Sequence, residues 1–326
     1  MSANLPWVEK YRPQCLDDVY GQTDTVETIR RFANEGRIPH LLFYGPPGSG
    51  KTSTVIALAK ELYGKNYRNM VLELNASDDR GIDVVREQIK NFASTRQIFT
   101  TSFKLIILDE ADAMTNVAQN ALRRVIEKFT KNTRFCILAN YSNKINPALL
   151  SRCTKFRFSP LSDNAVSDRV EYVAKAERLN LPENSKAALV KLSGGDMRKA
   201  LNVLQACQSS LDNMDEEIDV DMIYDCIGAP KPQSIETILN AIVKNDWLDA
   251  IHTMAKIRSI EGLALSDLIT SFVEIFENYE LKQQTRAKLL KGLADIEYGI
   301  SKGGNDRIQS TAVIGCIKDA LECEAA

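Results

Sequence analysis

The sequence has no apolar run near the roughly 18 residues that a membrane-spanning helix needs. Its first seven residues also lack the basic segment and following apolar run of a signal peptide. Lys and Arg number 41 and Asp and Glu 43, so the formal net charge is −2. This balance excludes a diffuse positive field, and any nucleic-acid site must be a local patch. We expect a protein of the cytosol or nucleus.

None of the cysteines has the C-x-x-C spacing of a structural zinc site. Their odd number and wide gaps indicate reduced thiols in an intracellular protein, mostly buried as small apolar groups. The seven are Cys15, Cys136, Cys153, Cys207, Cys226, Cys316 and Cys323.

The chain also lacks internal repeats and low-complexity tracts, and its 326 residues suit two or three domains. In the first half, short apolar runs alternate with segments of helical spacing. We expect strands at 41–44, 70–74, 104–108, 135–139 and 154–158, and helices at 52–62, 82–92 and 119–129. This alternation predicts an α/β fold with a doubly wound parallel sheet.

After Pro160 the strand pattern ends. Helical spacing at 164–179, 183–192 and 197–207 predicts a small helical domain. The Gly- and Pro-containing segment 228–232 is typical of a linker, and everything from Ser234 onward has the pattern of amphipathic helices. We therefore expect three domains, at 1–160, 161–230 and 231–326.

The most specific motif is a phosphate-binding loop between a predicted strand and a predicted helix. Residues 45–52 fit G-x-x-x-x-G-K-[ST] in the context that this motif requires. Glycines allow backbone N–H groups to surround phosphate oxygens, Lys51 supplies a charge to the β- and γ-phosphates, and Thr52 is a Mg²⁺ ligand. The expected nucleotide contacts here are Gly45, Pro46, Pro47, Gly48, Ser49, Gly50, Lys51, Thr52 and Ser53.

Two carboxylates follow the apolar run 105–108, at the strand end where open α/β sheets bind ligands. Asp109 suits the Mg²⁺ shell, and Glu110 suits a general base that polarises the attacking water. The strand at 135–139 ends in Asn140, and in the sheet order of P-loop enzymes it lies beside the strand that carries Asp109. Asn140 then either binds the γ-phosphate or attacking water, or simply closes its strand as a turn residue.

Together these motifs resemble the clamp-loader subunits of the AAA-plus ATPases, and in particular the small subunits of replication factor C. The resemblance rests on the phosphate loop, Asp109-Glu110-Ala111-Asp112, Asn140, Ser151-Arg152-Cys153 and Gly194, Asp196 and Arg198. It extends to Pro6-Trp7-Val8-Glu9-Lys10-Tyr11-Arg12-Pro13 and to Asn75-Ala76-Ser77-Asp78-Asp79-Arg80-Gly81. It implies an AAA-plus domain, a helical lid and a helical collar that holds subunits together.

The resemblance also implies roles for single residues. Asn140 matches sensor 1, and Arg198 matches sensor 2 in the lid. Arg152 matches the arginine finger that acts on ATP held by a neighbouring subunit. Asn75 matches a polar residue that restrains Glu110 until DNA binds. The adenine is expected against Tyr11, Arg12, Val19 and Tyr20.

The implied function is an ATP hydrolase within a hetero-pentamer, with ATP and Mg²⁺ as cofactors. By this resemblance, the pentamer is expected to open the sliding clamp, proliferating cell nuclear antigen. It is expected to load the clamp onto primer–template DNA in replication and repair, in the nucleus. Arg80, Arg86 and Lys144 match positions that touch duplex phosphates. Ile98 and Phe99, after Gln97, resemble a clamp-binding peptide in a polar loop.

Each role has an ordinary alternative. Arg152 and Arg198 can be solvated surface charges, and Tyr11 and Tyr20 half-buried aromatics. Arg80 can be neutralised by the two preceding aspartates, and the pair at 98–99 can pack on the domain's own core.

Two other functions are also compatible with the sequence. One is a scaffold subunit that binds nucleotide only structurally, against which the intact Lys51, Asp109 and Glu110 argue. The other is an AAA-plus helicase or Holliday-junction motor, which needs a DNA-binding module such as a winged helix. Residues 234–326 have too few strand signals for one.

Overall fold

The computed structural model describes residues 5–76, 82–95, 103–211 and 216–325. The chain divides into two compact units, Met1–Ile218 and Asp219–Ala326. The predicted boundary between the nucleotide-binding domain and the lid, at 160, lies inside the first unit, and the predicted boundary at 230 lies within the second. The three-domain division stays a proposal.

A five-stranded parallel sheet forms the centre of the first unit. Its strand order is β2-β3-β4-β1-β5, and every neighbouring pair is parallel. The strands are β1 (Leu41–Tyr44), β2 (Val71–Asn75), β3 (Lys104–Asp109), β4 (Thr133–Ala139) and β5 (Thr154–Arg157). All five predicted strands are confirmed, with ends displaced by at most two residues. β3 and β4 are neighbours, as expected for the strands that lead to Asp109 and Asn140.

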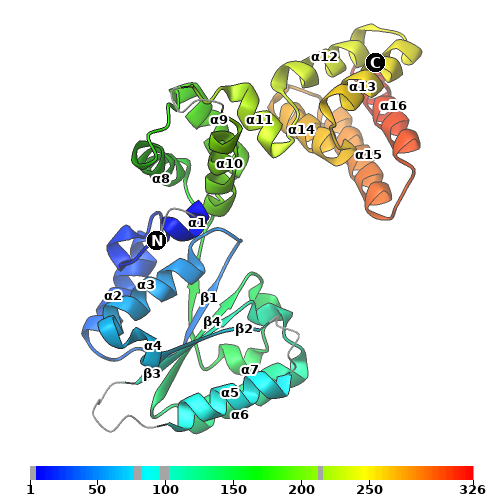
Figure 1. Ribbon diagram of the computed structural model, residues 1–326. Coiled ribbons are helices and arrows are strands. Elements are labelled where there is room, and N and C mark those ends of the chain that lie inside the picture. The colour runs from blue at the N-terminus through cyan, green and yellow to red at the C-terminus, as the bar shows by residue number, and fades with distance from the viewer. Residues whose placement is uncertain (1–4, 77–81, 96–102, 212–215, 326) are drawn as a thin grey trace. The chain divides into compact units, whose positions relative to one another are not determined.

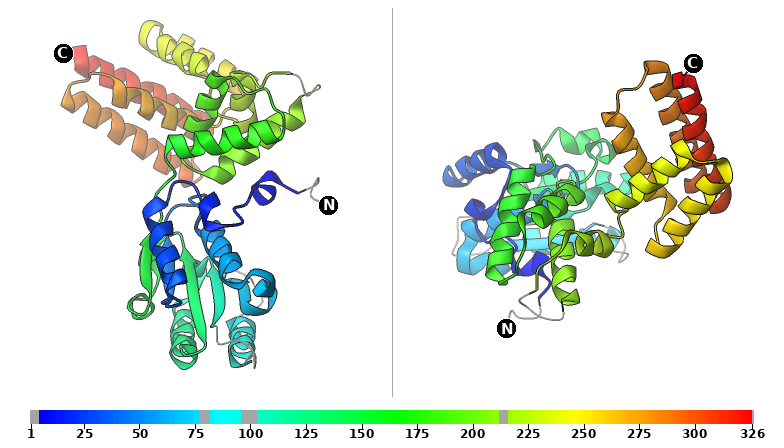
Figure 2. Two further views of the ribbon diagram at one scale, coloured as in Figure 1. Left: turned by 90° about the vertical axis from the view of Figure 1, so that its left-hand side faces the viewer. Right: turned by 90° about the horizontal axis from the view of Figure 1, so that it is seen from above.

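Helices cover both faces of this sheet (Figures 1 and 2). Leu41 and Phe43 pack on one face with α2 (Thr23–Asn34) and α3 (Lys51–Tyr63). Leu42, between them, packs on the other face with α5 (Ile82–Ser94), α6 (Asn116–Phe129) and α7 (Pro147–Leu150). Alternate residues of a strand point to opposite faces, so a strand covered on both sides must be apolar throughout. The predicted doubly wound architecture is thus confirmed.

Short elements complete the sheet domain: α1 (Trp7–Lys10), α4 (Tyr67–Met70), η1 (Leu16–Asp18), η2 (Gly64–Asn66), η3 (Ala111–Ala113) and η4 (Ser142–Lys144). The helical part of the same unit comprises α8 (Asp163–Ala176), α9 (Glu183–Ser193) and α10 (Met197–Ser210). The first segment of the chain joins the two parts, because the backbone N–H of Trp7 donates to Oε1 of Gln205 on α10 at 2.9 Å.

The described residues of the second unit form helices and connecting turns without a strand. The helices are α11 (Val220–Ile227), α12 (Pro232–Lys244), α13 (Trp247–Glu261), α14 (Leu265–Asn278), α15 (Gln283–Ser301) and α16 (Asp306–Ala325). Ile238, Leu268 and Phe272 are fully buried at its centre. Among the described residues, no helix combines the length and apolar character that crossing a membrane requires.

Candidate nucleotide site

The phosphate-binding loop connects β1 to α3, as predicted. Lys51, the first residue of α3, is 8% exposed. Its Nζ donates to the carbonyl oxygens of Gly45 and Pro46, each at 2.8 Å, and to Oδ1 of Asn140 at 3.1 Å. Burial lowers the pKa of this ammonium, and the nearby Asp109 carboxylate opposes that shift. The loop therefore holds a positive charge at the start of a helix, where the helix dipole also favours an anion.

Two glycines of the loop meet different requirements. Gly50 caps α3 with a φ of 93°, a conformation that side chains rarely adopt. Gly48 also has positive φ, and a Cβ atom there would lie 1.7 Å from Oδ1 of Asp196, at the start of α10. Only glycine permits this close approach between the loop and the helical part of the unit.

The acidic end of β3 adjoins the loop. The Thr52 hydroxyl donates to Oδ2 of Asp109 at 2.9 Å, which brings the two predicted Mg²⁺ ligands together. Glu110 follows with a φ of 54°, one of the two non-glycine residues in the described chain with positive φ. Such a backbone costs on the order of 1 kcal/mol or more and is concentrated at functional sites. Asn75 ends β2 and pairs in register with Asp109, the residue that precedes Glu110.

A cleft of about 750 Å³, including solvent at its mouth, opens beside the loop. That size is in the range of sites for small molecules and cofactors. Its lining combines three segments that are far apart in the sequence. They contribute the predicted adenine contacts Tyr11, Arg12, Val19 and Tyr20, the loop residues Gly48, Ser49, Gly50, Lys51, Thr52 and Ser53, and, from the segment predicted as a lid, Leu161, Arg169, Met197, Arg198 and Leu201.

Arg169 of α8 is a cleft residue that was not predicted from the sequence. It is 8% exposed, donates from Nη2 to the Tyr11 carbonyl, and lies 5.2 Å from the Tyr20 ring centroid. Glu177 fixes the N-terminal segment beside Arg169, because its Oε1 accepts from Lys10 Nζ and Tyr11 Oη, each at 2.5 Å. Burial, followed by the bond to Glu177, raises the pKa of Tyr11.

A sequence signal for Arg169 does exist. It lies three residues after Val166 and four before Val173, both fully buried, and so on the apolar face of α8. A charged residue on such a face needs a partner. The partners come from the N-terminal segment, which no local pattern links to α8.

Arg198 enters the cleft from the first turn of α10. Asp196 caps this helix by accepting from the backbone N–H groups of Arg198, at 2.8 Å, and Lys199, at 3.3 Å. The Arg198 side chain is exposed and is close enough to lower the pKa of the Lys51 ammonium electrostatically. A cation at the start of α10 thus lies in the cleft near Lys51, and its role as sensor 2 stays a prediction.

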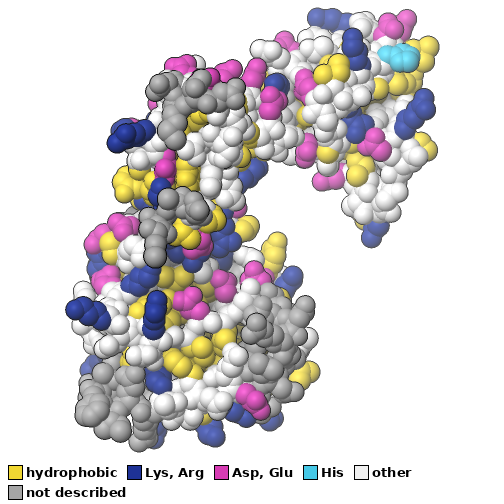
Figure 3. Space-filling model, viewed as in Figure 1, with side chains coloured by type: hydrophobic (Ala, Val, Ile, Leu, Met, Phe, Trp, Pro, Cys, Tyr) yellow, Lys and Arg dark blue, Asp and Glu magenta, His cyan; other side chains and the backbone are white. Residues whose placement is uncertain are grey.

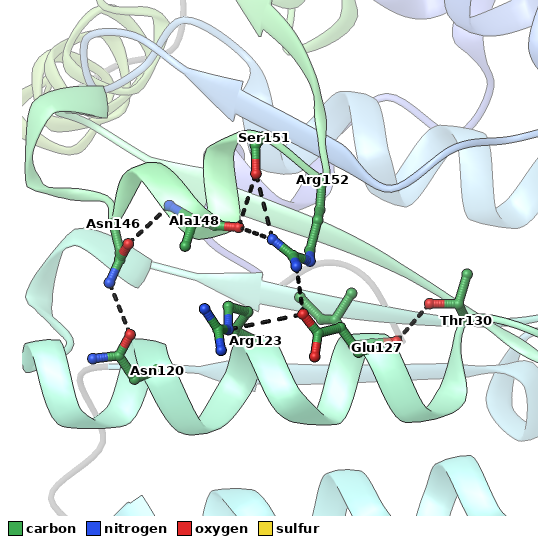
Figure 4. A network of polar contacts seen from close by, with 9 residues as sticks. Asn120, Arg123, Glu127, Thr130, Asn146, Ala148, Ser151 and Arg152 are labelled. Atoms are coloured by element: carbon green, nitrogen blue, oxygen red, sulfur yellow. Dashed lines mark hydrogen bonds and ion pairs between the residues drawn. The ribbon is translucent and has the colours of Figure 1, made fainter.

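Arg152 does not line this cleft. It follows α7, where Nη1 donates to the Ala148 carbonyl at 2.6 Å and Nη2 pairs with Oε1 of Glu127 at 2.5 Å (Figure 4). Its side chain is 36% exposed. A position outside the chain's own cleft is compatible with action on a neighbouring subunit.

The predicted DNA and clamp contacts are less completely placed. Arg80, Ile98 and Phe99 lie outside the described residues, and for Arg86 the structure describes only its place in α5. Lys144 is exposed in η4, with Nζ 5.0 Å from the Tyr141 ring centroid. On the face drawn in Figure 3, basic and acidic side chains of the described residues are mixed, in keeping with the net charge.

Comparison with known proteins agrees with this geometry. The profile of the ATPase family associated with various cellular activities (AAA) matches residues 41–161, and that of the replication factor C C-terminal domain matches residues 230–316. Replication factor C subunit 3 of Saccharomyces cerevisiae is 64% identical over 323 residues, covering 98% of this chain and 95% of that protein. Replication factor C subunit 5 of Homo sapiens is 50% identical, covering 99% of this chain and 95% of that protein.

Among solved structures, a RuvB mutant of Thermotoga maritima has a TM-score of 0.55 at 15% identity. The structural match covers 78% of this chain and 88% of the RuvB chain. This likeness supports the AAA-type fold alone. The identity with the curated relatives extends over nearly the full length of both chains, through both units. The chain therefore belongs to the replication factor C family of AAA ATPase subunits.

Proposed function

We propose that this chain is an ATP-hydrolysing subunit of a hetero-oligomeric clamp loader, which opens a sliding clamp and loads it onto primer–template DNA. The observation that carries the proposal is the cleft between the phosphate loop and the lid. It unites Tyr11 and Tyr20, Lys51 and Arg198, and β3 presents its acidic end at the same loop. No part expected of a hydrolysing site is replaced.

Within this site, each residue acts on a different part of the nucleotide or on the attacking water. The Tyr11 and Tyr20 rings offer an apolar surface to adenine, and Lys51 exchanges its carbonyl partners for phosphate oxygens. Asn140, which accepts a hydrogen bond from Lys51, orients the attacking water molecule. Glu110 accepts a proton from that water, and Arg198 stabilises the developing charge.

The residues also fit Mg²⁺. The Thr52 hydroxyl oxygen and the Asp109 carboxylate oxygen lie 2.9 Å apart, and both are hard oxygen donors. Nucleotide-bound Mg²⁺ takes few protein ligands of this kind, since phosphates and waters complete its shell. When bound, the ion would neutralise charge on the β- and γ-phosphates.

The wider cycle requires partners. The relatives' names describe subunits, and we propose that this chain assembles with other replication factor C subunits through its second unit, in the nucleus. Arg152 then completes a neighbour's site. Ile98 and Phe99 contact the clamp, proliferating cell nuclear antigen, and Arg80, Arg86 and Lys144 contact duplex phosphates. The helical second unit argues against a motor that carries a winged helix.

The test uses the complex reconstituted with its other subunits, with Lys51→Ala and Glu110→Gln made in this chain. Lys51→Ala should abolish ATP binding at this site, because it removes the buried phosphate-facing charge. Glu110→Gln should retain binding and slow hydrolysis at this site by roughly 10²- to 10⁴-fold, since an amide cannot act as a base. Nucleotide occupancy and turnover should be measured with and without clamp and primed DNA.

Lys65→Ala, an exposed lysine in η2, is the matched control and should change neither quantity. Unchanged ATP affinity in Lys51→Ala would remove the site assignment. Hydrolysis by the wild-type complex that responds to neither clamp nor primed DNA would contradict the clamp-loader function while leaving the ATPase site intact.

A further inference from the structure

The guanidinium of Arg152 is folded back onto its own subunit. Nη1 donates to the Ala148 carbonyl at 2.6 Å and lies 3.4 Å from the Ser151 hydroxyl oxygen, while Nη2 contacts Glu127 Oε1 at 2.5 Å (Figure 4). Both terminal nitrogens of the guanidinium are therefore directed at this chain. A side chain extended toward another subunit cannot keep all of these contacts, so engagement requires their exchange.

Glu127 is the charged member of this set. It lies in the last turn of α6, and its side chain is 44% exposed. A second arginine, Arg123, lies one turn earlier on the same helix, with Nε 3.8 Å from the same Oε1 atom. That Nε is buried and has no hydrogen-bond partner. One carboxylate thus interacts with two guanidinium groups. If either group moves away, the other remains beside the carboxylate.

We propose that Glu127 is a positioning residue for the arginine finger. It holds Arg152 against α6 and α7 until the phosphates of a nucleotide in an adjoining subunit compete for the guanidinium. Arg123 then closes on Glu127, so that the carboxylate does not lose its charge partner. This inference rests on the proposed role of Arg152 in trans.

The strength of the contact suits reversible retention. Exposed ion pairs shift equilibria only by about 1.4- to 5-fold, since solvent screens both charges. A triphosphate carries more negative charge than one carboxylate and presents several oxygens to the arginine fork. The phosphate therefore wins the competition, while Glu127 reduces the fraction of subunits whose finger is free to engage.

The test places Glu127→Gln in this chain within the reconstituted complex. P-loop lysines of every other site are replaced by alanine, so that only the adjoining site hydrolyses ATP. Glu127→Gln should lower the KM for ATP at that site by about 1.4- to 5-fold, with kcat unchanged, because the neutral amide competes less for the finger. The difference should shrink as salt rises from about 0.05 to 0.3 M.

Glu127→Asp, which keeps the charge on a shorter side chain, should give an intermediate KM. Glu27→Gln is the control, since Glu27 pairs with Arg31 on α2 at 3.5 Å in a more exposed ion pair away from Arg152, and it should leave KM unchanged. The double variant Arg152→Ala with Glu127→Gln should behave like Arg152→Ala alone.

The outcomes separate the two proposals. If Arg152→Ala leaves the adjoining site unaffected, the finger role itself fails. If Arg152→Ala slows that site but Glu127→Gln leaves KM unchanged or raises it, only the retention by Glu127 is overturned, and the ion pair simply ties α7 to α6. An effect of Glu127→Gln that persists without Arg152 would also overturn it.

Discussion

Lys51 and Thr52 are adjacent in sequence but serve different halves of the phosphate site. Lys51 Nζ bonds to loop carbonyls and Asn140, whereas Thr52 Oγ1 bonds to Asp109. Successive residues of a helix are rotated by about 100°, so the first turn of α3 presents a cation and a hydroxyl group in separate directions. The G-K-[ST] order therefore carries geometric information, and these two positions were predictable from the motif.

His40 provides a residue-scale prediction about stability. Its ring is buried, Nδ1 accepts from the Phe135 backbone N–H at 3.2 Å, and burial, with Arg134 as a smaller cause, lowers its pKa to about 4. Between pH 6.5 and 4 the unfolded chain binds a proton that the folded chain does not. Stability is therefore complete above pH 6.5 and should fall by about 1.4 kcal/mol per unit as pH drops through this window.

The measurement is urea unfolding of the full chain at several pH values, followed by the fluorescence of the buried Trp7 in a background where Trp247 is replaced by Phe. His40→Gln should flatten this part of the pH profile, because the amide does not titrate. His252→Gln, at the exposed second histidine on α13, is the control. Equal slopes for wild type and His40→Gln would contradict the assignment.

At the scale of elements, the proposed DNA contacts lie on α5 and just before it. Arg80 precedes α5 and Arg86 lies within it. With a net charge of −2, duplex affinity has to come from a few phosphate contacts, without base reading. Arg80→Ala with Arg86→Ala should lower the salt slope of DNA binding by about two units, equally on primed templates of unrelated sequence.

The assay titrates salt against affinity for two such templates, using the assembled complex. Lys65→Ala with Arg68→Ala, which removes two exposed charges near α4, is the matched control. An unchanged slope would make the α5 arginines ordinary surface charges, and a defect on one template alone would make them base readers.

Element prediction depended on how many apolar positions each element buries. β3 and β4 are almost continuous apolar runs, so their presence followed from the sequence. α2 was not predicted, because only Val26 and Ile29 are buried among twelve mostly polar residues. A helix that covers the sheet with so narrow a stripe gives a weak periodic signal.

At the scale of the molecule, the second unit should fold without the first. Residues 219–326 surround their own core, which includes the fully buried Ile238, Leu268 and Phe272. We expect the isolated fragment to be helical by circular dichroism and to unfold cooperatively on heating. Leu268→Ala should reduce its free energy of unfolding by about 2–5 kcal/mol, because it leaves a cavity in that core.

An exposed change in the same fragment, Ile260→Ala on α13, is the control and should have little effect on unfolding. A fragment with helical content but no cooperative transition would mean that this unit depends on the rest of the chain or on other subunits.

The sequence by itself determined the phosphate loop, the acids after β3 and the strand–helix alternation. These features depend on local spacing and on chemistry that few residue types can supply. The tertiary structure alone decided that Arg169 contacts Tyr11 in the cleft, and that Arg152 pairs with Glu127. The partners in these contacts are 158 and 25 residues apart. Packing between elements chooses such partners, and no local periodicity records that choice.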